Sequence, residues 1–259
     1  MSILFRSFAI AGALLALGGF ARDASAQLLN GGFETFAATG GDRGVPTGGL
    51  SNWTIGFTSG SNVGYPAIIT STLANGSGFT ANGTGIALSN PSNGGSTTIT
   101  ASPATGNFLA WENPNNACNC YLYQSIGGLT VGTTYMLSFY EAGAVWTGST
   151  VATSDNWKVG WGTTAATSVA SQTTSATVNT PIKGFSGWLQ QQWTVTATAT
   201  SMVLSFMANH PSGVAQPPFA LLDGVSLTAV STPEPASAIL VASGMLGLAG
   251  LRRMARRRG

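Results

Sequence analysis

The stretch TTYMLSFYEAG, residues 133–143, decides the fold of this chain. Its apolar side chains alternate along the chain, so that Tyr135, Leu137 and Phe139 share one face of an extended strand. The same alternation recurs in WTVTATA (193–199), SMVLSFMAN (201–209) and FALLDGVSLTAV (219–230). Helical periodicity is absent, and Asn-Gly turn signals separate the extended segments. The sequence therefore predicts an all-β fold, a two-sheet antiparallel sandwich.

The N-terminal stretch MSILFRSFAIAGALLALGGFARDASAQ (1–27) has the layout of an export signal. Arg6 precedes an apolar core from Phe8 to Phe20, and the small residues at 24–26 form a small-x-small cleavage pattern. We expect a secretory signal peptide over residues 1–26, cleaved after Ala26. An N-terminal anchor that is never cut is the alternative.

The C-terminal stretch has an apolar run over residues 236–251, which the arginines of RRMARRR follow at once. As a helix the run would be about 24 Å long, whereas a bilayer core is about 30 Å thick. Flanking positive charge stays on the cytoplasmic side. We therefore expect a marginal membrane helix that halts the chain with its bulk outside.

Pro233, Glu234 and Pro235 precede this helix. Together, the Pro-Glu-Pro triplet, the short apolar helix and the arginine cluster over residues 232–259 resemble the PEP-CTERM sorting tail of Gram-negative bacteria. The resemblance implies recognition by exosortase, a membrane enzyme that removes the tail, and association with extracellular polysaccharide. It implies a transient anchor in the inner membrane, then a place at the cell surface or in the extracellular matrix.

The body left between these ends, residues 27–231, has the length of one large β domain. It holds three basic residues against six acidic ones, a net charge of −3. Nucleic acid binding depends on Lys and Arg side chains that replace counterions. The composition of the body therefore excludes nucleic acid as a partner.

Cys118 and Cys120 lie one residue apart in NNACNCYLY (115–123). Export would place them in an oxidising compartment, which favours a disulfide. Closure across one residue is strained, however, and strain makes a disulfide easier to reduce. A Cys118–Cys120 disulfide and two free thiols both remain open. No histidine or second cysteine pair stands nearby to complete a metal site.

Asp223 is the most informative acidic residue, because it shares a strand face with Phe219, Leu221, Val225 and Leu227. A carboxylate on a core face is costly unless it is paired or binds a metal. Glu34 follows Phe33 in the expected first strand, and first and last strands are often neighbours. Two carboxylates at one edge suit Ca²⁺. Alternatively, backbone N–H groups cap both carboxylates and no metal binds.

The body as a whole, over residues 28–228, resembles carbohydrate-binding modules with a galactose-binding-like jelly roll. The resemblance is carried by NGGFE (30–34), YQSIGGLTVGTTYMLSFYEA (123–142), GWLQQQWTVTATATSMVLSFMA (187–208) and LLDGVSL (221–227). It implies a structural Ca²⁺ held by a first-strand Glu and a last-strand Asp, here Glu34 and Asp223. The family often has two consecutive Asp at that point, where this chain has Asp223 and Gly224.

Aromatic rings stack on the apolar faces of sugars, so the tryptophans are candidates for glycan contacts. Trp157 and Trp161 share one side of WKVGW, and Trp146 lies in a loop rich in Gly and Thr. These three are our candidates for ligand binding, against the alternative that each belongs to the core. Strand patterns place Trp53, Trp188 and Trp193 in the core, and Trp111 is unassigned.

Enzyme signatures are poor. The single histidine, His210, lies in the turn-like NHPSG, where we expect an exposed loop residue, and neither Gly-x-Ser-x-Gly nor His-Glu-x-x-His occurs. Carboxylates such as Glu112, Glu141 and Asp155 could serve a glycosidase only if they converged. We expect a non-enzymatic exported protein that binds or associates with exopolysaccharide. The alternative is a structural matrix or surface protein without a sugar site.

Overall fold

The computed structural model describes residues 27–36, 42–45, 50–60, 64–113, 119–211 and 218–230. The expected signal peptide (1–26) and the sorting tail (232–259), with Pro233, Glu234 and Pro235, lie outside the described residues, as does Cys118. Across the described ranges, no helix has both the length and the apolar character needed to cross a membrane.

Strands dominate the described part of the chain. In chain order the elements are β1 (Thr54–Phe57), β2 (Tyr65–Thr70), α1 (Ser71–Ala74), β3 (Phe79–Ala81), β4 (Thr84–Ile86), the 3-10 helix η1 (Pro91–Asn93), β5 (Asn107–Glu112), β6 (Cys120–Ile126), β7 (Thr134–Val145), β8 (Thr153–Gly162), α2 (Ala165–Ala170), β9 (Thr173–Thr174), β10 (Val178–Thr180), β11 (Leu189–Thr196), β12 (Met202–Asn209) and β13 (Pro218–Ala229).

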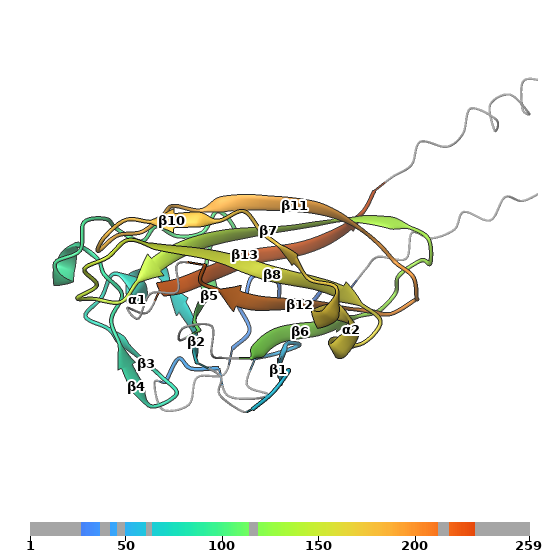
Figure 1. Cartoon of the computed structure of the whole chain (residues 1–259), viewed down its shortest axis with the longest axis horizontal. Helices are drawn as coiled ribbons and strands as arrows, with labels where there is room; N and C mark the ends of the chain where they lie inside the picture. Colours follow the sequence, from blue (N-terminus) through green and yellow to red (C-terminus); the bar gives the residue numbers. More distant parts are fainter. Residues whose placement is uncertain are drawn as a thin grey trace, which may run out of the picture.

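Two antiparallel sheets face each other. The first has the order β1-β6-β12-β8-β10, with β9 also paired to β8, and the second has the order β11-β7-β13-β5-β2. The long strands β7, β8, β11, β12 and β13 run along the long axis, with α2 toward one end and the β3–β4 hairpin toward the other (Figure 1). The predicted jelly-roll sandwich is confirmed, because neighbouring strands in both sheets are distant in sequence, as β13 is from β5.

The main core lies between the sheets. Tyr135, Leu137 and Phe139 of β7 face this core, as the alternation predicts, and they meet Leu204 and Phe206 of β12. A second apolar cluster covers the outer face of the second sheet. There Phe108 and Phe219 meet Phe79 and Leu88 from the segment that contains β3 and β4. The second sheet is thus buried on both faces over part of its area.

A β-bulge interrupts the alternation that the sequence predicted for β13. The register against β7 shifts between Asp223 and Ser226, and Gly224 adopts a positive φ of 59°. Phe219 and Leu221 therefore belong to the outer cluster, whereas Val225 and Leu227 belong to the core between the sheets. A bulge inserts one residue and reverses the alternation. The residues expected to share one face therefore lie on two, and they are Phe219, Leu221, Asp223, Val225 and Leu227.

The strand that the sequence predicted around Glu34 is also absent from the described residues. Phe33 has a positive φ of 56°, and Glu34 lies outside any strand. The segment nevertheless runs beside β13, because the Val225 N–H donates to the Gly31 carbonyl over 3.0 Å. The expectation that Glu34 lies next to the last strand therefore holds.

The two short helices were not predicted. Thr70 caps α1, and Thr164 forms a capping box with Thr167 at the start of α2. A capping box satisfies the free backbone N–H groups of the first turn. Helices of 4 and 6 residues are too short to show a 3.6-residue period.

Candidate functional site

A groove opens between the edges of the two sheets. Its volume is about 590 Å³, and strand β11 forms one wall while β8 and the segment around β9 form the other. Trp193 comes from β11 and Trp161 from β8. The lining residues are Met136, Leu137, Val159, Gly160, Trp161, Ser171, Thr173, Gln192, Trp193, Thr194, Val195 and Leu204.

Both tryptophans are half-buried and fixed in place. The Trp161 indole N–H donates to the Thr196 carbonyl over 2.9 Å, which ties β8 to the end of β11. The Trp193 ring meets Phe139 edge to face, with centroids 5.4 Å apart. Both side chains rest against the main core, so each ring is held rigidly while part of it remains open to the groove.

The rim of the groove is polar and uncharged. Gln192, Thr194, Ser171 and Thr173 are exposed, and no Asp, Glu, Lys or Arg is among the lining residues. Aromatic surface supplies contact area, and a few polar groups orient a ligand. The groove is therefore suited to a neutral ligand that has apolar faces and many hydroxyl groups.

The structure separates the three predicted ligand-binding tryptophans. Trp161 lines the groove, but Trp157 is fully buried at 0% exposure, and its indole N–H donates to the Leu221 carbonyl over 3.1 Å. Trp157 and Trp161 do share one side of β8, but that side faces the core. Trp157 therefore cannot stack on a ligand, and its assignment is corrected.

Trp146 is half-buried and lies away from the groove. It meets Tyr65 and Phe219 edge to face, each with centroids 6.2 Å apart. It also lines a separate shallow cleft of about 430 Å³ beside the β3–β4 hairpin. The sequence pattern placed Trp193 in the core, but Trp193 lines the groove together with Trp161. Trp146 does not line this groove. Trp53 and Trp111 are buried, and Trp188 is half-buried.

Asp223 lies buried at the bulge of β13. Its Oδ1 accepts the Gly224 N–H over 2.7 Å, whereas its Oδ2 is buried without a hydrogen-bond partner among the described residues. Burial raises the pKa of Asp223 to about 7, and the nearby charge of Glu34 adds to the rise, while the Gly224 N–H and the nearby Ser102 hydroxyl oppose it. An ionised Asp223 would need a further partner.

Glu34 stands beside Asp223 but is exposed. Its Oε1 accepts the backbone N–H of Asn107 over 3.0 Å, and its Oε2 accepts the Asn107 side-chain amide over 3.3 Å. Gly106 makes room for this carboxylate, because a Cβ there would lie 1.9 Å from Glu34 Oε1. Glu34 and Asp223 therefore fit a hard cation such as Ca²⁺ through the orphaned Asp223 oxygen. Within the described ranges, no three His, Cys, Asp or Glu residues gather as a metal cluster.

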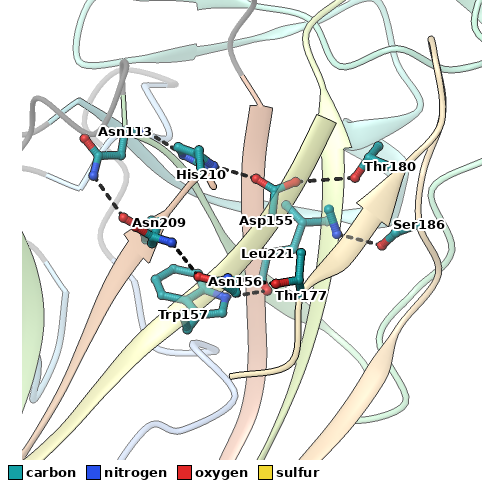
Figure 2. A network of polar contacts seen from close by, with 12 residues as sticks. Asn113, Asp155, Asn156, Trp157, Thr177, Thr180, Ser186, Asn209, His210 and Leu221 are labelled. Atoms are coloured by element: carbon teal, nitrogen blue, oxygen red, sulfur yellow. Dashed lines mark hydrogen bonds and ion pairs between the residues drawn. The ribbon is translucent and has the colours of Figure 1, made fainter. Parts of the chain in front are cut away.

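A buried polar network lies at the end of the sandwich, around Asp155 of β8 (Figure 2). His210 is only 2% exposed, so the expectation of an exposed loop residue is wrong. Its Nδ1 lies 2.6 Å from Asp155 Oδ1, and its Nε2 accepts the Asn113 backbone N–H over 3.1 Å. This arrangement requires the proton on Nδ1, which donates to Asp155. Both ring nitrogens are engaged, so the pair braces the fold.

The other oxygen of Asp155, Oδ2, accepts the Thr180 hydroxyl of β10 over 3.3 Å. Burial raises the pKa of Asp155, while the hydrogen bond from His210 opposes the rise. Burial raises the pKa of Glu141 on β7 to about 7, and the negative charge of Asp155 adds to this rise. Asp155, His210 and Glu141 are thus buried titratable groups on this side of the sandwich, where the sequence predicted an exposed His210 and gave no reason for Asp155 and Glu141 to lie near each other.

Cys120, the first residue of β6, is buried and is not a free thiol. Cys118 lies outside the described residues, so its pairing with Cys120 stays a prediction.

No family model matches the chain, and no curated protein matches it. Among solved structures, TmCBM61 in complex with β-1,4-galactotriose is similar at 13% identity and a TM-score of 0.38, with 78% of this chain and 97% of that chain covered. A CBM4 structure is similar at 14% identity and a TM-score of 0.35, with 78% and 98% covered.

The enzymatically active domain of tailspike protein 4 from bacteriophage CBA120 is similar at 11% identity and a TM-score of 0.37. That alignment covers 75% of this chain but only 21% of the tailspike chain. Similarities at this level carry no argument about function. The functional case depends on the geometry of the groove.

Proposed function

We propose that this chain is an exported, non-enzymatic protein that binds neutral polysaccharide through the groove between β8 and β11. One observation carries the proposal. Trp161 and Trp193, from different sheets, line one groove whose lining residues carry no charge. Two fixed rings allow stacking on sugar faces, and the exposed Gln and Thr side chains offer hydrogen bonds to hydroxyl groups.

Export and sorting belong to the same proposal. The signal peptide over residues 1–26 would send the chain across the inner membrane, and the tail over residues 232–259 resembles an exosortase substrate. The extracellular polysaccharide that this resemblance implies is a ligand of the class that the groove suits. The groove would therefore bind polysaccharide in the same compartment to which the tail would send the chain.

A structural Ca²⁺ is part of the proposal. Asp223 and Glu34 would hold it, and the ion would stabilise the junction between the N-terminal segment and β13. Asp223 Oδ2 is the supporting observation, because a buried carboxylate oxygen without a partner is costly. Trp146, in its separate cleft, is a second candidate contact for a sugar.

The test is affinity electrophoresis of the full-length chain through gels that contain neutral exopolysaccharide from the producing strain. We expect retardation of the wild type and its loss in Trp193→Ala and Trp161→Phe. Trp188→Ala is the matched control, because Trp188 is also half-buried but packs on Phe108 and Phe185 away from the groove. If the wild type is not retarded, the alternative of a structural matrix protein without a sugar site stands.

A further inference from the structure

Strand β11 makes a polar connection at each end of the groove. At one end, the Trp161 indole N–H donates to the Thr196 carbonyl over 2.9 Å. At the other end, Gln191 of β11 reaches the carboxyl group of Glu141. Gln191 and Thr196 are five positions apart along the strand, a span of about 17 Å. The groove therefore lies between two polar connections.

Glu141 makes the second connection through both of its carboxyl oxygens. It is fully buried on β7, where its Oε1 accepts the Gln191 side-chain N–H over 2.6 Å. Its Oε2 accepts the Ser175 hydroxyl over 2.5 Å. One carboxyl group thus joins strand β7, the edge strand β11 and the segment that follows β9.

Ser175 is itself fixed to the first sheet. Its backbone N–H donates to the Trp157 carbonyl over 2.8 Å, and its hydroxyl oxygen accepts the Trp157 backbone N–H over 2.8 Å. The hydroxyl group is therefore oriented toward Glu141 by the backbone of β8. Glu141 reaches the first sheet through a chain of bonds with little freedom.

Both partners of Glu141 adjoin residues that line the groove. Gln191 immediately precedes Gln192 and Trp193, and Ser175 follows Thr173 by two positions. A change in the bonds of Glu141 would therefore shift one wall of the groove against the other. We propose that Glu141 is the positioning residue of the groove, and that it sets the spacing of the two walls by accepting hydrogen bonds from both. The consequence for affinity rests on the polysaccharide binding proposed above.

The protonation state of Glu141 bears on this role, because burial raises its pKa to about 7. An ionised carboxylate accepts both donors with charge-assisted bonds, whereas a protonated one must place its own proton and weakens one of the two. The titratable groups that face Glu141 are Asp155 of β8 and, paired with Asp155, His210. The walls should therefore be held more firmly above pH 7 than below it.

The experiment follows the groove without any ligand. The full-length chain is labelled with 5-fluorotryptophan, and the ¹⁹F resonances of Trp161 and Trp193 are assigned from Trp161→Phe and Trp193→Phe. In the wild type, both resonances should shift through one transition centred near pH 7. Glu141→Gln resembles the protonated form and should remove the transition. Glu112→Gln is the matched control, since Glu112 is a buried carboxyl with a pKa of about 7 on β5, outside the groove lining.

The two bonds of Glu141 are tested separately with Ser175→Ala and Gln191→Ala. Each should displace the Trp193 resonance and weaken retardation by the exopolysaccharide about tenfold, the size expected for one hydrogen bond to a charged group. Gln190→Ala, on the other side of β11, should change neither. Persistence of the pH transition in Glu141→Gln, or equal effects in Gln190→Ala and Gln191→Ala, would overturn the proposal.

The same experiment separates this inference from the proposed function. If the ¹⁹F results are as expected but the polysaccharide never retards the wild type, Glu141 still positions the walls and polysaccharide binding is refuted. If Trp193→Ala abolishes retardation while Ser175→Ala and Gln191→Ala do not weaken it, the groove binds polysaccharide and the role of Glu141 is refuted.

Discussion

His210 Nδ1 lies 2.6 Å from Asp155 Oδ1, and both side chains are almost completely buried. The pair connects β8 with the chain that follows β12, while the bond from Asn113 adds the end of β5. A carboxylate at this depth is tolerated because His210 and Thr180 both donate to it. The network thus ties together three separate parts of the chain.

His210→Ala should destabilise the fold by about 3 kcal/mol, because removal of one partner leaves a buried charge without compensation. The Asn113 N–H would also lose its acceptor. Urea denaturation at pH 7 measures the free energy of unfolding. Thr180→Val is the control, since it removes only a 3.3 Å hydrogen bond to the same carboxylate and should cost about 1 kcal/mol. Equal losses in the two variants would show that the pair is not the main brace.

Gly143 makes the approach of Asp155 to β7 possible. A Cβ at this position would lie 2.1 Å from Thr180 Oγ1 and 2.5 Å from Asp155 Oδ2. Gly143→Ala should therefore lower the free energy of unfolding by about 1–3 kcal/mol, the usual range for overpacking. Gly85→Ala, in β4, is the matched control because no atom lies within 4 Å of the place that its methyl group would occupy. Differential scanning calorimetry should show a lower melting temperature for the first variant alone.

The sequence predicted the strands and not the network, for a physical reason. Alternation assigns residues to two faces of a strand, so Trp157 and Trp161 were correctly placed on one side of β8. It does not show how deep each position lies, and Trp157 proved to be core while Trp161 reached the groove. His210 and Asp155 are 55 positions apart in the chain. Only the pairing of β8 with β12 brings them together.

The sequence did not predict the groove or the bulge, for related reasons. Trp193 alternates with Val195 just as a core residue would, and its partial exposure arises because β11 is the edge of its sheet. The bulge after Asp223 carries one local signal, Gly224, which adopts the left-handed conformation that glycine favours. The expected burial of Asp223 was nevertheless right, because Asp223 precedes the shift and shares the outer face with Leu221.

Glu112 provides a test of pH dependence with one dominant cause. Burial raises its pKa from 4.5 to about 7, so the folded chain binds its proton more tightly than the unfolded chain does. This contribution to stability is fully present below pH 4.5 and is lost as the pH rises through 7. Glu141 and Asp223 act in the same direction. Without metal, the wild type should melt at a higher temperature at pH 5.5 than at pH 8.

Glu112→Gln should flatten this pH dependence. The variant carries no charge at pH 8, so it should melt above the wild type there and close to it at pH 5.5. Thermal melts in EDTA over this range provide the measurement. A variant that loses stability equally at both pH values would instead indicate that the Glu112 carboxyl makes a bond that glutamine cannot replace.

Ca²⁺ should act on the same pH range through Asp223. The ion binds the ionised carboxylate, and the pKa of Asp223 is about 7, so protons compete with Ca²⁺ at pH 5.5 but little at pH 8. At pH 8, free Ca²⁺ at 100 times its Kd should stabilise the folded chain by about 2.7 kcal/mol. Asp223→Asn should abolish this gain, and Glu112→Gln should retain it. Melting curves with and without Ca²⁺ at both pH values decide the matter. A gain that survives Asp223→Asn would place the ion elsewhere, and no gain in the wild type at pH 8 would favour two carboxyl groups held by hydrogen bonds alone.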